Sequence, residues 1–159
     1  LWRQAGSALQ GLMAGQSQDI GKEGVLVVDT DNGIKLPNGL YVKYPNLRKE
    51  RNEEDGRVEV VYDTKRGRAI IPNRIYGGKV IENVCQALAR IVIGEQLLRV
   101  AERYKVVMTV HDAIGCIAPI SEVKEAMTYV EDSMKLRPEW ALDLPLDCEG
   151  GYANSYGEC

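Results

Sequence analysis

Residues 80–118 read VIENVCQALARIVIGEQLLRVAERYKVVMTVHDAIGCIA, and they carry the strongest structural signal in the chain. Apolar residues recur at steps of three and four over 80–103, which predicts one long amphipathic helix. This stripe consists of Ile81, Val84, Leu88, Ile91, Val92, Leu98 and Ala101. Two β-rich runs follow at 105–110 and 114–118, and so short a connection between them forces an antiparallel hairpin. The stretch therefore predicts a helix followed by a β-hairpin.

Further elements are predicted on both sides of this stretch. Residues 1–13 place apolar side chains at helical spacing. Residues 25–44 alternate strand-forming runs with turn signals, which predicts a β-meander; the turn signals are Asp31-Asn32-Gly33 and Asn38-Gly39. Ser121 can cap a second helix that ends before Pro138, and residues 144–156 are expected to form a last strand. The expected fold class is α+β, with an antiparallel sheet covered on one face by helices.

The composition is that of one ordinary folded domain, because 159 residues with 45% apolar and 27% charged side chains can bury a sizeable core. Disordered, collagen-like and coiled-coil classes are excluded. No apolar run is long enough to predict a membrane span, the opening residues lack a signal-peptide pattern, and a first residue other than Met suggests a fragment. Four Cys without a C-x-x-C pair, beside a single His, predict neither a zinc site nor a disulfide framework. Each Cys is expected to be a small buried side chain in a reducing compartment.

The net charge of −3 conceals a gradient along the sequence. Residues 43–79 hold ten Lys and Arg against six Asp and Glu, whereas residues 111–159 hold three against ten. A basic segment can follow a polyanion even in an acidic protein, because phosphate attraction acts over roughly 8–10 Å. The alternative is a solvated surface in which cations and acids are interleaved. The cations that could neutralise phosphates are Arg48, Lys49, Arg51, Lys65, Arg66, Arg68, Arg74 and Lys79, and the acids interleaved with them in the loop are Glu50, Glu53, Glu54 and Asp55.

Three motifs occur together in the second half of the chain: YGGKVIENVCQALAR at 76–90, VHDA at 110–113 and LPLDCEGGYANSYGEC at 144–159. In this combination the chain resembles the C-terminal part of a family-A DNA polymerase, of the bacterial Pol I type, in the form carried by bacteriophages. The resemblance implies that residues 1–23 are the helix that follows the fingers and its connection, and that residues 24–159 are the C-terminal palm segment. Within that segment it implies a β-meander and basic loop over 24–79, a long helix over 80–103, the catalytic hairpin over 104–118, and a helix and final strand over 119–159.

The resemblance implies a two-metal site for nucleotidyl transfer at the VHDA turn. VHDA is similar to the family's third polymerase motif, which places Asp112 on the metal-binding aspartate and His111 on the catalytic-site histidine before it. Nucleotidyl transfer uses two divalent ions that stabilise the attacking and leaving oxygens. An exposed Asp on a hairpin suits Mg²⁺, which takes one or two protein carboxylates together with phosphates and waters. On spacing alone, an Asp in a turn is explained by its own backbone hydrogen bonds.

The same resemblance implies DNA contacts on the long helix and just before it. Gln86 matches a helix glutamine that touches the minor-groove side of the primer-template, where acceptors occur at every base pair. Lys79 follows Gly77 and Gly78, which would allow close approach of a phosphate to a helix N-terminus. Arg74 is the other cation assigned to DNA. Packing or pairing on the protein's own surface is the alternative for each of these side chains.

The chain departs from the family pattern in three respects. Ala113 stands where most members have Glu. Glu82 stands where many have an Asn that faces DNA, and because a carboxylate cannot donate a hydrogen bond to a base acceptor, Glu82 is expected to pair with a neighbouring Arg or Lys. The family's first motif, which carries the second metal-binding carboxylate, and the fingers helix that holds the incoming nucleotide have no counterpart here. The Mg²⁺ site would therefore find only one of its protein ligands, Asp112, in this chain.

The expected function is that of the C-terminal palm portion of a template-directed DNA polymerase active in DNA replication. Its partners would be primer-template DNA and deoxynucleoside triphosphates, its cofactor Mg²⁺, and its location the bacterial host cytoplasm, with no membrane involved. Fingers, thumb and the N-terminal half of the palm would come from a longer parent chain, and this portion alone is expected to be inactive. One alternative is a non-catalytic nucleic-acid-binding or structural module derived from a palm. Another is an unrelated α+β domain whose His-Asp turn is incidental.

Overall fold

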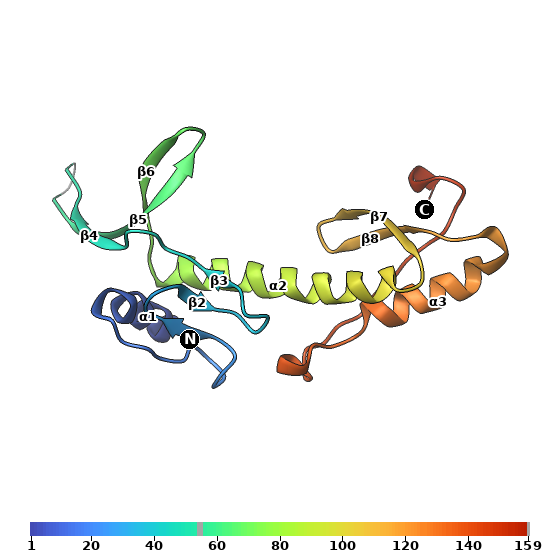
Figure 1. The fold of residues 1–159 in the computed structure, drawn as a ribbon, viewed down its shortest axis with the longest axis horizontal. Helices are drawn as coiled ribbons and strands as arrows, with labels where there is room; N and C mark the ends of the chain where they lie inside the picture. The colour runs from blue at the N-terminus through green and yellow to red at the C-terminus, as the bar shows by residue number, and fades with distance from the viewer. Residues whose placement is uncertain (54–55, 159) are drawn as a thin grey trace. The chain divides into compact units, whose positions relative to one another are not determined.

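The computed structural model describes residues 1–53 and 56–158. Glu54 and Asp55, counted above among the interleaved acids, and Cys159 lie outside the described residues. The chain divides into two compact units, residues 1–88 and residues 89–159, whose elements are labelled in Figure 1. The single sheet predicted from the sequence is wrong, because the strands of the described residues form three separate antiparallel sheets.

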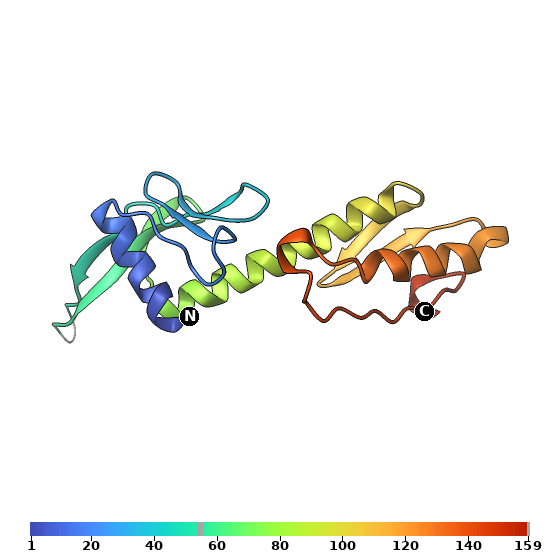
Figure 2. The same ribbon diagram turned by 90° about the horizontal axis from the view of Figure 1, so that it is seen from below.

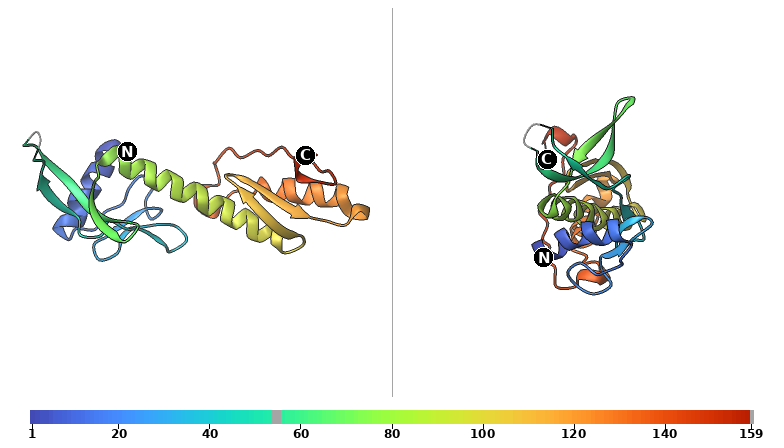
Figure 3. Two further views of the ribbon diagram at one scale, coloured as in Figure 1. Left: turned by 90° about the horizontal axis from the view of Figure 1, so that it is seen from above. Right: turned by 90° about the vertical axis from the view of Figure 1, so that its left-hand side faces the viewer.

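The first unit contains one helix, two three-stranded sheets and the first half of a second helix. Its elements are α1 (Trp2–Ala14), β1 (Val27–Asp29), β2 (Gly33–Lys35), β3 (Tyr41–Val42), β4 (Arg48–Arg51), β5 (Val58–Arg66), β6 (Ala69–Arg74) and the start of α2 (Gly77–Ala101). Strands β1–β2–β3 and β4–β5–β6 pair in sequence order. The first of these sheets confirms the meander predicted over 25–44. The β5–β6 hairpin projects from the rest of this unit in Figures 1 and 3.

The β1–β2 turn forms where the sequence predicted it. Asp29 Oδ1 accepts hydrogen bonds from the backbone N–H groups of Asp31 and Asn32, at 3.0 and 3.1 Å. Together with the side chain of Asn32, these contacts lower the pKa of Asp29. Gly33 then begins β2 with φ 114°, and a Cβ at this position would fall on the carbonyl oxygen of Val42. The turn therefore requires glycine for its backbone angle and for the space around it.

The core of the first unit lies between α1, the meander and the start of α2. Its most deeply buried side chains are Ala5, Ala8, Leu9, Val28, Ile34, Ile75 and Val80. At Gly77 a Cβ would lie 3.0 Å from the backbone nitrogen of Gly6 and 3.2 Å from the carbonyl oxygen of Trp2. This glycine therefore lets the backbones of α1 and α2 approach each other, which an additional side-chain atom would prevent.

The described part of the second unit contains a β-hairpin, helix α3, the second half of α2 and three 3₁₀ turns, one before α3 and two after it. After the second half of α2 its elements are β7 (Lys105–Val110), β8 (Ala113–Ile117), η1 (Ile120–Glu122), α3 (Val123–Met134), η2 (Glu139–Ala141) and η3 (Tyr156–Glu158). In Figures 1 and 2 the hairpin lies on one side of α3 and of the second half of α2. Within this unit, helices thus cover one face of a small antiparallel sheet.

The buried side of α2 differs from the predicted apolar stripe. Leu98 is 67% exposed, whereas Gln96 is only 3% exposed. The Gln96 side-chain amide donates to the carbonyl oxygens of Met134, at 2.6 Å, and Leu136, at 3.3 Å. These carbonyls come at and just after the end of α3, where the helix itself supplies no donors. The buried glutamine therefore joins the two helices, which hydropathy alone could not predict.

Three other local expectations are wrong. Residues 144–156 form no strand, in keeping with a segment that holds Pro145, Gly150 and Gly151 and few β-branched residues. Ser121 lies within η1, and α3 begins without a side-chain cap. The three described cysteines are not deeply buried, since Cys85 is exposed and Cys116 and Cys148 are half-buried.

None of the helices in the described part of the chain combines the length and the apolar character needed to cross a lipid bilayer.

Candidate functional site

The candidate catalytic turn lies at the tip of the β7–β8 hairpin. Val110 pairs with Ala113, so His111 and Asp112 alone connect the two strands. A register irregularity between Val106 and Met108 interrupts the ladder toward its other end, whereas the pairs from Met108 to Val110 beside the turn are regular. Both turn side chains are exposed, and within the described residues neither makes a hydrogen bond or ion pair. The structure thus presents them to solvent as free groups.

His111 holds an unusual backbone conformation. Its φ is 53°, one of two positive values among the described non-glycine residues. L-residues pay roughly 1–2 kcal/mol for this left-handed region, and Asn, Asp and His are enriched among those that adopt it. The strain is imposed by a two-residue connection that must match the twist of the strands, and it lies at the residue adjacent to Asp112.

We expect His111→Gly to be more stable than His111→Ala by about 1 kcal/mol, because only glycine adopts a positive φ without a Cβ penalty. Urea unfolding of the two variants measures this difference directly. Both variants lack the imidazole, so the effect of losing it cancels in the difference between their unfolding free energies. Equal stability of the two variants would show that the turn does not need a left-handed residue.

Asp112 suits a role as one ligand of a divalent ion but not as a complete site. Its carboxylate is exposed and unpaired, which leaves both oxygens available to a hard cation. Within residues 1–53 and 56–158, however, no three His, Cys, Asp or Glu side chains are grouped as a metal centre requires. The donor set therefore fits Mg²⁺ only if phosphates, waters or another segment supply the remaining oxygens.

The DNA-contact candidates on α2 form a row in the first unit. Lys79 Nζ lies 2.8 Å from both carboxylate oxygens of Glu82, and this hydrogen-bonded pairing raises the pKa of Lys79. Gln86 Nε2 makes a longer contact of 3.4 Å with Glu82 Oε1. The expected pairing of Glu82 with a neighbouring cation is therefore confirmed. Gln86 stays exposed, and its amide oxygen accepts no hydrogen bond within the described residues.

Arg74, the last residue of β6, is also engaged. Its Nη1 lies 2.9 Å from Glu59 Oε1, and its guanidinium stands 5.9 Å from the ring centroid of Tyr76. Its side chain remains 63% exposed, whereas that of Glu59 is only 15% exposed, so release of Arg74 would leave a largely buried carboxylate without this partner. Arg74, Lys79 and Gln86 thus belong to the first unit, whereas His111 and Asp112 belong to the second.

The two glycines before Lys79 have a different role from the one expected. They lie inside the first turn of α2, which begins at Gly77, and not before it. At Gly78 a Cβ would lie 3.0 Å from the ring of Tyr76 and would also meet the ring of Trp2. The space that glycine creates is therefore filled by α1 and by neighbouring aromatic side chains. Packing thus explains these glycines, and the approach of a phosphate to Lys79 stays a prediction.

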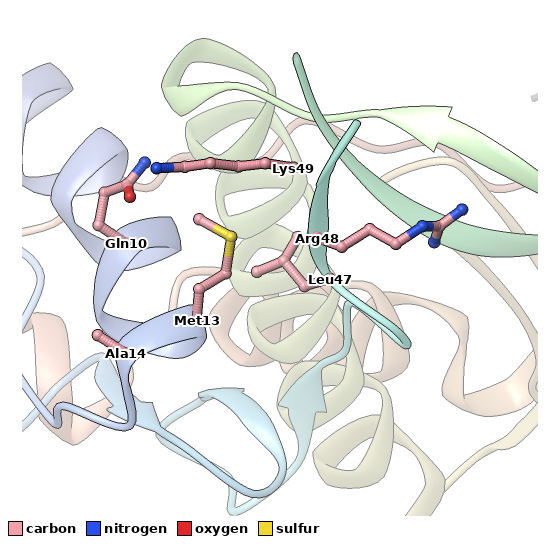
Figure 4. A pocket seen from close by; sticks show the side chains of 6 residues that line it. All are labelled: Gln10, Met13, Ala14, Leu47, Arg48 and Lys49. Carbon is pink, nitrogen blue, oxygen red and sulfur yellow. The ribbon is translucent and has the colours of Figure 1, made fainter. Parts of the chain in front are cut away.

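Sequence reasoning missed an open pocket of about 440 Å³ in the first unit. It lies between α1 and β4 and is lined by Gln10, Met13, Ala14, Leu47, Arg48 and Lys49. Figure 4 shows the side chains of Lys49 and Gln10 pointing toward each other, while Arg48 points away to the opposite side of β4. No local pattern predicts such a meeting, because the two lining segments are far apart in the sequence.

The chain is similar to the DNA polymerase of Bacillus phage SP02, with 32% identity over 129 residues. The aligned region covers 77% of this chain and 19% of the phage enzyme, so the chain spans about a fifth of the length of this relative. No family model matches the chain, and no solved structure matches it. The similarity supports a relationship to DNA polymerases.

Proposed function

We propose that the chain is the C-terminal palm portion of a family-A, template-directed DNA polymerase that extends a primer 3′ end during DNA replication. The observation that carries this proposal is Asp112, an exposed and unpaired carboxylate at the tip of a two-residue hairpin turn, in a chain similar to a phage DNA polymerase. A free carboxylate on a short hairpin is a suitable protein ligand for a divalent ion that also binds phosphates.

Asp112 would hold Mg²⁺ in this proposal, together with a carboxylate from outside these 159 residues. When bound, a pair of Mg²⁺ ions would stabilise the attacking 3′-hydroxyl oxygen and the leaving pyrophosphate oxygen. His111, whose φ is 53°, would help to set the direction of the adjacent Asp112 side chain. Both residues stay exposed to solvent, which leaves room for a primer terminus and a triphosphate beside them.

Gln86, Lys79 and Arg74 would contact the primer-template. The amide of Gln86 can both donate and accept, which suits minor-groove acceptors that occur at every base pair. Lys79 and Arg74 are held by Glu82 and Glu59, so each would exchange a carboxylate for a DNA phosphate. The exposed Lys79–Glu82 pair is weak, so its exchange would cost little, whereas the exchange at Arg74 must offset the loss of a partner by the largely buried Glu59.

A non-catalytic nucleic-acid-binding module derived from a polymerase palm is the second candidate. The observation that favours it is Ala113, which follows Asp112 where most members of the family that the chain resembles have Glu. In that case the parent protein would bind primer-template with a salt-dependent affinity and would incorporate no nucleotide.

The two candidates are separated by a primer-extension assay on the protein encoded by the complete reading frame. We expect that protein to add templated nucleotides in the presence of Mg²⁺, and the 159-residue chain alone to add none, because it offers one metal-binding carboxylate and no nucleotide-binding helix. Binding of primer-template without extension by the longer protein would support the second candidate. Primer extension by the 159-residue chain alone would contradict the proposal that the second metal-binding carboxylate and the nucleotide-binding helix lie outside this chain.

A further inference from the structure

The β4–β5–β6 sheet separates its charges between two faces. Residues that pair across an antiparallel ladder point to the same face, and successive residues alternate. The registers Arg48↔Val61, Glu50↔Glu59, Asp63↔Pro72 and Val61↔Arg74 therefore place all the acidic side chains of the three strands on one face. Lys49, Arg51 and Arg66 lie on the other face, which carries no acid; we call it the acid-free face. In Figure 4, Arg48 and Lys49 point to opposite sides of β4, as this alternation requires.

The acids on the first face are already neutralised by arginines of the same face. Arg48 lies 2.8 Å from Asp63 Oδ1 and 3.1 Å from Glu50 Oε2, and Arg74 pairs with Glu59 at 2.9 Å. Hydrogen bonds from Asn46 and Arg48 lower the pKa of Asp63. These carboxylates are therefore unavailable to the cations of the acid-free face.

The hairpin between β5 and β6 ends in a cluster of unpaired cations. Its tip is the sequence Lys65-Arg66-Gly67-Arg68, and all four residues are exposed. Within the described residues, none of these three cations makes a hydrogen bond or ion pair, and the same holds for Lys49. Arg74 and Lys79, by contrast, are both held by acids. Three cations without an acid partner among the described residues thus lie within four consecutive positions of the projecting hairpin.

We propose that the hairpin tip and the acid-free face contact the phosphodiester backbone of a nucleic acid. The inference deepens the proposed function and rests on it for the identity of the polyanion. Arg66 stands six positions along β5 from Val60, the partner of Lys49, which is about 20 Å of strand. That length matches about six nucleotides of a duplex strand at 3.4 Å each. Cations spread over such a distance can each contact a different phosphate of the regularly spaced nucleic-acid backbone.

An acidic polypeptide fits these observations less well. A peptide strand would gain most of its affinity by adding to the free edge of β6, and Pro72 removes a backbone donor from that strand. The cations also lie along a projecting hairpin and do not surround a pocket. The observations therefore favour a nucleic acid that is bound through its regularly spaced phosphates, without a requirement for a particular base sequence.

The experiment measures binding of labelled primer-template DNA to the 159-residue chain by fluorescence anisotropy across a salt series. One variant combines Lys65→Gln, Arg66→Gln and Arg68→Gln. The matched control combines Arg3→Gln, Lys105→Gln and Lys124→Gln, three exposed cations elsewhere, and so changes the net charge equally. We expect the tip variant to bind about tenfold more weakly or worse at low salt, with a salt slope smaller by about 2.7, since each of three lost duplex phosphate contacts contributes about 0.9.

Several outcomes overturn the inference. They are no measurable binding by the unchanged chain, equal weakening in both triple variants, and displacement of DNA by poly-L-glutamate at equal charge, which would assign the face to an acidic polypeptide. Circular dichroism of all three proteins checks that they are equally folded. The primer-extension assay tests the proposed catalysis separately. If the longer protein extends primers but its tip variant binds DNA as tightly as before, only the present inference is refuted. If the tip substitutions weaken DNA binding but the longer protein incorporates no nucleotide, only the proposed catalysis is refuted.

Discussion

Asp112→Asn in the longer polymerase proposed above is expected to lower the rate of primer extension by about a thousandfold at saturating Mg²⁺. Asparagine keeps the size of the side chain but removes its negative charge, which is what a hard divalent ion binds. Loss of about 4 kcal/mol of transition-state stabilisation corresponds to a factor of about 10³. Steady-state extension at several Mg²⁺ concentrations measures the effect. Primer-template affinity should change little, because the carboxylate does not attract phosphate.

The matched control for this variant is Asp132→Asn. Asp132 is also exposed in the second unit and makes no hydrogen bond or ion pair within the described residues, so both substitutions should leave the unfolding free energy within about 0.5 kcal/mol of the parent. Extension should fall only in the Asp112 variant. Full activity of Asp112→Asn would remove the central residue of the proposed function, whatever the fold.

Gly33→Ala is expected to destabilise the first unit by about 3–4 kcal/mol, an effect typical of steric conflict at a special backbone position. A methyl group here would fall on the carbonyl oxygen of Val42 and lie 3.2 Å from the Cα of Lys43. Both neighbours are backbone atoms of β3 and the residue after it, so neither can rotate away. The φ of 114° adds a further penalty for any L-residue. Urea unfolding followed by circular dichroism gives the loss of free energy.

Gly39→Ala serves as the comparison for this prediction. Gly39 also has a positive φ, 82°, but a Cβ there would have no atom within 4 Å. Its substitution should therefore cost only the backbone penalty, about 1 kcal/mol. Hydrogen exchange should locate the loss of protection in β1 to β3 for Gly33→Ala. Equal destabilisation by the two substitutions would mean that the close approach to Val42 contributes nothing.

The elements predicted best are those fixed by local chemistry. The Asp31-Asn32-Gly33 and Asn38-Gly39 turns set the meander, because few residues other than glycine and asparagine adopt the required angles. The hairpin around His111 follows from the shortness of its connection. At the site, the exposure of Asp112 and the pairing of Glu82 with a cation were both predicted correctly from these patterns.

The elements predicted badly are those that depend on partners distant in sequence. Leu98 was expected in the core, but Gln96 takes that place because its amide meets carbonyls at the end of α3. Gly77 was assigned to ligand approach, but it meets the backbone of α1. Neither partner is visible in a window of neighbouring residues. The charge separation across β4, β5 and β6 likewise emerges only when the register of the strands is known.

Helix α2 belongs to both compact units, because their boundary falls between Leu88 and Ala89, near its middle. Severing the chain there would leave each piece with a helical stub close to the length, about 12–15 residues, at which isolated helices become marginal in water. The unpaired carbonyls and N–H groups created by the cut would meet solvent inside what had been continuous hydrogen bonding. Expression of the halves as separate proteins should therefore yield less stable products than their compactness suggests, and co-expression should restore neither helix fully.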